Sequence, residues 1–202
     1  MLVIGLTGSI ASGKSETTKL LIKAGIPVFD ADSEVHRLYQ RQVVIDQVAA
    51  EFPQAIVSGA IDRRELGKIV LANPSDLKKL EHIVHPLVRA ARQHFIDKAK
   101  LDGLKYVVVD IPLLFETGED KTMDHIVVVS APDNIRRARV MERPNMTAEK
   151  LHNIEARQMP NAEKCKRADF VIDNSGSLDQ LREQVDALII KLKALPGANI
   201  NA

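Results

Sequence analysis

The chain carries a glycine-rich segment of the kind that binds phosphate. Gly8, four intervening residues and then Gly13, Lys14 and Ser15 match the pattern G-x-x-x-x-G-K-[ST]. Glycines let successive backbone N–H groups turn toward one anion, while the lysine reaches the β and γ phosphates and the serine hydroxyl binds Mg²⁺. A tight turn rich in glycine and serine is the alternative. The match follows an apolar run and opens a helical pattern, and this context favours a phosphate site.

Two aspartates, Asp32 and Asp110, follow strand-like runs. At the carboxyl end of a parallel strand, a carboxylate projects over the crevice in which ligands bind. A kinase that phosphorylates an alcohol needs a group that accepts the hydroxyl proton, and we assign this role to Asp32. The alternative for Asp32 is the N-cap of the helix that begins beside it. Asp110 is expected to hold the magnesium ion together with Ser15.

Arginines recur on one face of the helical pattern after residue 132. Arg136, Arg139 and Arg143 share that face, and Pro144 ends it. Guanidinium groups that close over a triphosphate stabilise the charge of the transferring group, so this segment predicts a lid. A solvated helix face is the alternative.

Other polar residues give weaker signals. Glu116 is either part of an acceptor pocket or an ordinary loop acid, and His85 either contacts the acceptor or starts a helix. His82 and His85 lack a third partner at metal-ligand spacing, so no zinc site is expected.

Short apolar runs alternate with helical patterns, which is typical of βαβ units. The predicted strands are Leu2–Thr7, Pro27–Asp30, Tyr106–Pro112, His125–Ala131 and Ala168–Asp173. The interval from Ser33 to Lys105 is expected to be helical throughout, with new helices starting at Pro74 and Pro86. A helical pair follows residue 132, a long amphipathic helix is expected over Asp179–Leu192, and Pro196–Ala202 forms a frayed tail.

These patterns predict an α/β protein of the P-loop NTPase type. Three α/β/α layers surround a five-stranded parallel sheet, with a helical substrate-binding insertion and a helical lid. The expected nucleotide-binding core comprises residues 1–32, 104–135 and 158–202, the acceptor domain 33–103, and the lid 136–157.

Composition narrows the class of partner. In 202 residues, 28 Lys and Arg against 27 Asp and Glu give a net charge of +1, which does not indicate a nucleic-acid surface. The amino-terminal run lacks the features of a signal peptide, and no apolar stretch approaches the roughly 20 residues that span a bilayer. Cys165 is the single cysteine, which suits a reducing, cytoplasmic setting. We expect a small-molecule substrate, no membrane and no obligate protein partner.

Seven segments, in their order and spacing, resemble the bacterial dephospho-CoA kinases: IGLTGSIASGKS, VFDAD, IDRRELGKIV, HPLVR, DIPLLFE, RARVMER and RQMPNAEKCKRADFVIDNSG. The resemblance extends from Leu2 to about Gly176. It implies ATP-dependent phosphorylation of the ribose 3′-hydroxyl of dephospho-CoA, the last step of coenzyme A synthesis.

The resemblance also implies roles for individual residues. Those expected to bind ATP are Gly8, Ala11, Ser12, Gly13, Lys14, Ser15, Glu16 and Asn174. Those expected to bind the acceptor are Asp32, Arg63, His85, Pro112, Leu113 and Leu114. Lys14, Asp32, Arg139 and Arg143 are the expected catalytic residues, and Ser15 and Asp110 the expected metal ligands.

This sequence departs from the family pattern at two positions of the loop. The family more often has glycine in place of Ala11 and threonine in place of Glu16. A positive φ at Ala11 would be strained. Two other functions stay open: a P-loop kinase for another nucleoside or small metabolite, and a non-catalytic nucleotide-binding regulator.

Overall fold

The computed structural model describes residues 1–196 and divides into two compact units. The first unit contains Met1–Phe29 and the chain from Lys98 onward, and the second contains Asp30–Asp97. The predicted tail, apart from Pro196, lies outside the described residues. No helix within residues 1–196 is both long and apolar enough to cross a bilayer.

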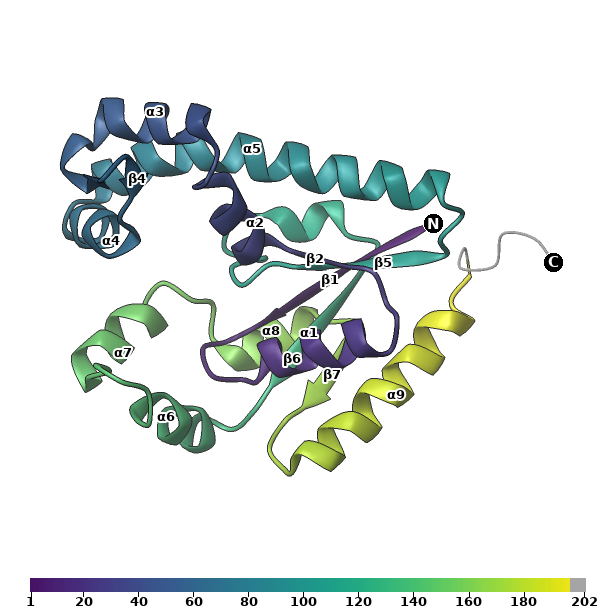
Figure 1. The fold of residues 1–202 in the computed structure, drawn as a ribbon. Coiled ribbons are helices and arrows are strands. Elements are labelled where there is room, and N and C mark those ends of the chain that lie inside the picture. The colour runs from purple at the N-terminus through teal and green to yellow at the C-terminus, as the bar shows by residue number, and fades with distance from the viewer. Residues whose placement is uncertain (197–202) are drawn as a thin grey trace. The chain divides into compact units, whose positions relative to one another are not determined.

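A five-stranded parallel sheet forms the centre of the first unit, which confirms the predicted fold class (Figure 1). The strand order is β2-β5-β1-β6-β7. The strands are β1 (Leu2–Gly8), β2 (Val28–Asp30), β5 (Tyr106–Asp110), β6 (His125–Ser130) and β7 (Phe170–Asp173). In register, Leu6 pairs with Asp110, Gly8 with Val129 and Ser130 with Asp173. The carboxyl ends of these strands therefore meet at one edge of the sheet, where ligands bind in parallel α/β folds.

Helices cover both faces of this sheet. On one face, α1 (Lys14–Lys23) and α9 (Leu178–Ala194) pack their apolar residues against Ile4 and Leu6 of β1. On the other face, Ile126 and Val128 contact the segment after β5 and α8 (Asn161–Arg167). Val107, Val108 and Val109 are all buried, as expected for a strand with helices on both sides.

The second unit is mainly helical. It contains α2 (Ala31–Leu38), α3 (Gln42–Glu51), α4 (Arg63–Ala72) and most of α5 (Pro74–Leu101) around their own apolar core. The expectation of helix throughout is wrong at one place, because β3 (Ile56–Val57) and β4 (Ala60–Ile61) form an antiparallel hairpin. Ser58 and Gly59 both have positive φ, at 50° and 79°, the conformation that a tight two-residue hairpin turn requires.

The expected helix start at Pro86 is also wrong, since α5 runs unbroken through this proline. A proline removes one backbone hydrogen bond from a helix and usually bends or ends it. Here Leu80 and Val84 before the proline, and Leu87 and Val88 after it, pack into one apolar core. This shared burial on both sides holds the helix together. Pro74 does begin the helix, as predicted.

The helical pair expected after residue 132 is present as α6 (Asp133–Met141) and α7 (Ala148–Glu155). The helix α8 was not expected, because its sequence reads as a charged run. Two short 3-10 turns, Pro53–Ala55 and Glu119–Thr122, complete the described structure.

Candidate phosphate-binding and acceptor sites

The glycine-rich loop joins β1 to α1 and turns several backbone N–H groups away from the protein. Glu16 and Thr17 donate to the carbonyl of Gly13, and Ser12 donates to that of Ser9. Within residues 1–196, the N–H groups of Ala11, Gly13, Lys14 and Ser15 have no acceptor. Unpaired amides at the positive end of a helix bind anions, so the loop has the donors that a phosphate needs.

Two glycines of the loop are required by close packing. A Cβ at Gly8 would lie 2.5 Å from Ser12 Oγ and 2.6 Å from the carbonyl oxygen of Val129. Gly13 has a φ of 94°, and a Cβ there would lie 1.8 Å from Asn174 Nδ2. Glycine is the residue that tolerates both the conformation and the contact. Ser12 Oγ is buried and has no hydrogen-bond partner in residues 1–196.

Ala11 adopts a φ of 58°, the left-handed region that favours glycine. An alanine in this region costs on the order of 1 kcal/mol. The loop conformation is therefore maintained by contacts elsewhere in the protein.

Lys14 and Asp110 form an ion pair at the base of the loop. Lys14 Nζ lies 2.5 Å from Asp110 Oδ1, and Thr18 Oγ1 donates to Asp110 Oδ2 at 2.6 Å. The Asp110 side chain is 2% exposed. The sequence pattern of α1 brings Lys14 and Thr18 to the same side of the helix, one turn apart. Both predicted residues thus meet at the strand end, and Thr18, which was not predicted, fixes the carboxylate.

Ser15 and Glu16 differ in their surroundings. Ser15 is exposed at the first turn of α1, and its hydroxyl has no partner within the described chain. Glu16 accepts a hydrogen bond of 3.1 Å from Lys19 and so pairs along the helix surface. The Ser15 hydroxyl and the Asp110 carboxylate are both oxygen donors, the type of ligand that suits a hard cation such as Mg²⁺. The residues present fit the predicted metal.

Asn174, directly after β7, supports the loop, and Arg139 of α6 in turn supports Asn174. Asn174 Nδ2 donates to the carbonyl of Ser12 at 2.8 Å, and Arg139 Nη2 donates to the carbonyl of Asn174 at 2.9 Å. Arg139 Nη1 is buried without a hydrogen-bond partner in residues 1–196, so one charged donor of this group is unused. Arg143 is exposed. The two predicted lid arginines are thus in different environments.

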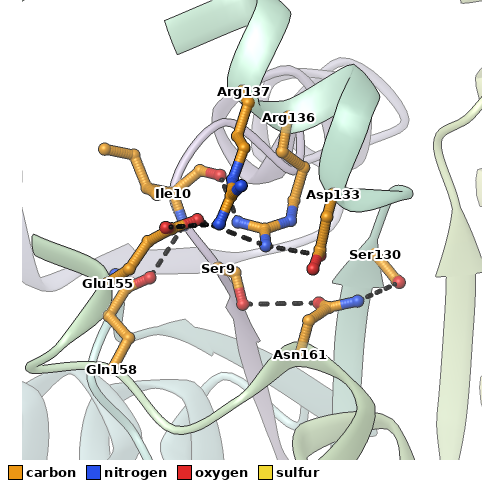
Figure 2. Close-up of polar contacts among 9 residues, drawn as sticks. All are labelled: Ser9, Ile10, Ser130, Asp133, Arg136, Arg137, Glu155, Gln158 and Asn161. Atoms are coloured by element: carbon orange, nitrogen blue, oxygen red, sulfur yellow. Dashed lines mark hydrogen bonds and ion pairs between the residues drawn. The ribbon is translucent and has the colours of Figure 1, made fainter. Parts of the chain in front are cut away.

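Arg136 belongs to a polar cluster that the sequence did not reveal (Figure 2). Its side chain is 6% exposed; Nη1 donates to the carbonyl of Ile10 at 3.2 Å, and Nη2 lies 2.7 Å from Asp133. Gln158 accepts a 3.0 Å hydrogen bond from the N–H of Ile10. Nearby, Ser9 Oγ lies 3.3 Å from Asn161 Oδ1. Helical spacing placed Arg136 on the predicted lid face, and its observed partners are a carbonyl and two carboxylates.

The three predicted acceptor-binding residues after β5 differ in their exposure and contacts. The carbonyl of Pro112 accepts a hydrogen bond of 3.0 Å from Thr7 Oγ1. The Leu114 side chain is fully buried in an apolar cluster, whereas Leu113 is 37% exposed. Leu113 therefore offers its side chain to a ligand, and Leu114 serves the core.

Glu116 forms a buried ion pair with Lys164. Lys164 is 0% exposed, and its Nζ lies 2.8 Å from Glu116 Oε1. The same oxygen accepts a hydrogen bond of 2.7 Å from the N–H of Met159. Neither alternative considered for Glu116 describes this: the carboxylate joins the segment after β5 to α8. Lys164 stands in a charged run, which gave no signal of burial.

In the second unit, Asp32 lies in the first turn of α2, two residues after β2 ends. The N-cap of this helix is Asp30, whose side chain accepts a hydrogen bond of 3.0 Å from the N–H of Ser33. The alternative role of Asp32 as the N-cap is therefore wrong. Its carboxylate is exposed and has no partner within residues 1–196, so it is available to a ligand.

Asp32 lines a pocket of about 390 Å³ that lies wholly within the second unit. Its other lining residues are Val35, His36, Tyr39, Arg63, Leu66, Gly67, Val70 and Leu80. Arg63 contacts the ring of His36. Burial raises the pKa of Tyr39, an effect that the nearby Arg63 partly offsets. An apolar floor edged by a carboxylate and a guanidinium suits a flat, polar-edged ligand. His85 is exposed and is not among the lining residues.

Comparison with known proteins gives one consistent family. The family model described as dephospho-CoA kinase matches residues 2–180. The dephospho-CoA kinase of Rhodopseudomonas palustris is 48% identical over 196 residues, which are 97% of this chain and 98% of that protein. That of Agrobacterium fabrum is 48% identical over 194 residues, 96% of this chain and 100% of that protein.

Among solved structures, the dephospho-CoA kinase from Campylobacter jejuni is similar, with a TM-score of 0.71 and 28% identity. The similarity covers 94% of this chain and 96% of that one. Sequence and structure therefore agree over nearly the whole length. This chain belongs to the dephospho-CoA kinase family.

Proposed function

We propose that this protein transfers the γ-phosphoryl group of ATP to the ribose 3′-hydroxyl of dephospho-CoA, which completes coenzyme A synthesis. The observation that carries the proposal is the loop with unpaired N–H groups beside the Lys14–Asp110 pair, in a chain of this family. Phosphoryl transfer needs little covalent chemistry from a protein. Positioning and charge stabilisation supply most of the rate.

The loop residues from Gly8 to Glu16 bind the ATP phosphates. The unpaired amides of Ala11, Gly13, Lys14 and Ser15 donate to phosphate oxygens, and the Lys14 ammonium neutralises the β and γ groups. The unused Nη1 of Arg139 is a further donor for the triphosphate, and exposed Arg143 supplies a second guanidinium. Asn174, which backs the loop, borders the nucleotide.

Ser15 and Asp110 would hold Mg²⁺, the Ser15 through its hydroxyl and Asp110 through its carboxylate. A bound ion would supply positive charge to offset that of the phosphates. Asp110 already engages both oxygens, with Lys14 and Thr18. We therefore expect Lys14 to leave Asp110 for the phosphates when nucleotide binds.

Asp32 acts as the general base. Its unpaired carboxylate accepts the proton of the 3′-hydroxyl as that oxygen attacks the γ-phosphorus and the bond to ADP breaks. The 390 Å³ pocket beside it takes the nucleoside end of the acceptor, with Arg63 at its edge. His85, Pro112, Leu113 and Leu114 complete the acceptor contacts through side chains or backbone.

In this scheme residues 33–103 form the acceptor domain and residues 136–157 a lid that excludes water during transfer. The reaction takes place in the cytoplasm, a reducing compartment in which a single unpaired cysteine is ordinary.

The test is to incubate the purified protein with ATP, Mg²⁺ and dephospho-CoA, and to follow ADP and coenzyme A. Equal formation of both is the expected result. A panel of nucleosides and small alcohols tests for a kinase with another acceptor. ATP binding without turnover on any acceptor would instead support a non-catalytic regulator.

A further inference from the structure

Ile10 lies at the tip of the phosphate loop, and both its backbone N–H and its backbone carbonyl form hydrogen bonds with side chains from outside the loop. The N–H donates to Gln158 Oε1 at 3.0 Å, and the carbonyl oxygen accepts from Arg136 Nη1 at 3.2 Å. Figure 2 shows the two side chains reaching Ile10 from α6 and from the segment after α7. Two consecutive peptide planes of the loop are thus fixed by residues far away in the sequence.

The orientation of the peptide between Ile10 and Ala11 decides where the Ala11 N–H points. In a trans peptide the carbonyl and the following N–H face opposite ways. Because Arg136 holds the carbonyl of Ile10, the N–H of Ala11 is turned to the other side, where it has no acceptor in residues 1–196. That N–H is one of the donors available to a phosphate.

This orientation of the Ile10–Ala11 peptide strains the backbone of Ala11. Ala11 has a φ of 58°, and a rotation of the peptide would release it from the left-handed region. Glycine at this position would carry no such penalty. Without the two external hydrogen bonds, the loop with alanine would favour other conformations more than a loop with glycine would.

The Arg136 side chain is itself held in place by two carboxylates. Asp133 lies 2.7 Å and Glu155 3.7 Å from its Nη2, and only 6% of the side chain is exposed. The two carboxylates offset its charge and keep it from reorienting. This differs from Arg139, whose Nη1 is unused.

We propose that Arg136 and Gln158 are positioning residues that hold the Ile10–Ala11 peptide in its phosphate-binding orientation and so make alanine acceptable at position 11. The inference rests on the proposed function only in that the loop binds the phosphates of a nucleotide. It assigns to Gln158, and to Arg136 of the supposed lid face, a role apart from the reacting groups.

The test is a double-mutant cycle read by ADP affinity, measured by calorimetry without acceptor. Gln158→Met keeps the side-chain size and removes the acceptor oxygen, and we expect it to raise the ADP dissociation constant about tenfold. In the Ala11→Gly background the same change should raise it less than about threefold. Equal factors in both backgrounds, or no loss in either, would overturn the proposal.

A second variant and a control distinguish loss of this positioning role from general destabilisation of the protein. Arg136→Lys keeps a positive charge beside Asp133 and Glu155 but loses the guanidinium geometry, so it should show the same dependence on residue 11. Gln47→Met makes the same substitution at an exposed position of α3, outside the phosphate loop and the proposed lid, and should leave ADP affinity unaltered. Loss of affinity in this control equal to that of Gln158→Met would also refute the proposal.

Steady-state kinetics separate positioning from a structural role. Gln158→Met should raise the KM for ATP and leave the KM for dephospho-CoA within about twofold. An equal rise in both would contradict the inference. Since ADP binding is measured without acceptor, a protein that bound ADP but did not phosphorylate dephospho-CoA would refute the proposed function while the cycle still decided this inference.

Discussion

Lys14 Nζ lies 2.5 Å from Asp110 Oδ1, and this ion pair connects the phosphate loop to the neighbouring strand end. Asp110 is almost completely buried and keeps its second oxygen on Thr18. The carboxylate therefore holds the lysine close to the loop before any phosphate binds. The same pair contributes to stability, so its two roles have to be separated by experiment.

We expect Lys14→Met to remove activity and to destabilise the fold. The loss of the cation should lower kcat by at least about 10³-fold. It also removes the cation that is paired with the buried Asp110 carboxylate, at a cost of about 3 kcal/mol. Adding Asp110→Asn should restore most of the unfolding free energy, measured by urea denaturation, without restoring turnover. Recovery of activity in the double variant would contradict the assigned role of Lys14.

Asp32→Asn should abolish chemistry and preserve the fold. Its carboxylate is exposed and bonds no other residue of the described chain, so unfolding should be unchanged, whereas removing a general base should lower kcat about 10² to 10⁴-fold. ADP affinity should stay as in the native protein.

Asp30→Ala provides the contrast two residues away. Asp30 caps α2 through Ser33, and loss of such a cap costs about 1 kcal/mol of stability. The two variants should therefore differ in kind: one loses turnover and the other loses stability. An Asp32→Asn enzyme with native kcat would exclude the general-base assignment.

Gly13→Ala should prevent nucleotide binding. The φ of 94° is strained for alanine, and its Cβ would collide with Asn174 Nδ2 at 1.8 Å. Asn174→Ala removes the collision but not the strain, so the double variant should regain only part of the ADP affinity. The check is ADP calorimetry of both variants. Full recovery in the double variant would show that the left-handed conformation is dispensable.

The sheet could be predicted from sequence because its signal is local. Uninterrupted valines in β5 and β6 report burial on both faces, and the motif from Gly8 to Ser15 marks the strand-to-helix turn. The hairpin at Ser58 and Gly59 was missed because two-residue strands carry almost no periodic pattern. Continuation of α5 through Pro86 depends on tertiary burial, which local propensity does not encode.

Site residues could be predicted where a sequence motif defines their chemistry. Residues whose role depends on tertiary packing could not be predicted. Lys14 and Asp110 were found and do meet. Lys164 and Gln158 were missed, because burial of a lysine in a charged run and a bond to Ile10 from a residue 148 positions away follow from the fold. Arg136 was placed on the face of a predicted lid by helical spacing alone. Spacing identifies a shared face but not what covers it.

Glu116 and Lys164 should be strongly coupled in stability. Removing either partner leaves a buried charge alone, so Glu116→Gln or Lys164→Met should each cost about 3 kcal/mol. The double variant should cost clearly less than the sum, because no unpaired charge remains. Urea denaturation of the four proteins measures the coupling. Simple additivity would show that the two charges do not depend on each other.

Alkaline pH should destabilise the protein partly through Tyr39. Burial raises the pKa of Tyr39 above the ordinary tyrosine value of about 10, with Arg63 opposing this, so the folded protein keeps the phenol proton at a pH where the unfolded chain releases it. The contribution of Tyr39 to the unfolding free energy is therefore fully present below about pH 10 and is lost as pH rises from there toward the folded-state pKa.

The Tyr39→Phe side chain cannot ionise, so this variant should lose less unfolding free energy than the native protein between about pH 9 and pH 11. Tyr106, whose pKa burial also raises, remains in both proteins and serves as a common background. Urea denaturation across this range measures the difference, and identical slopes for the two proteins would show that the Tyr39 phenol ionises equally well in the folded state.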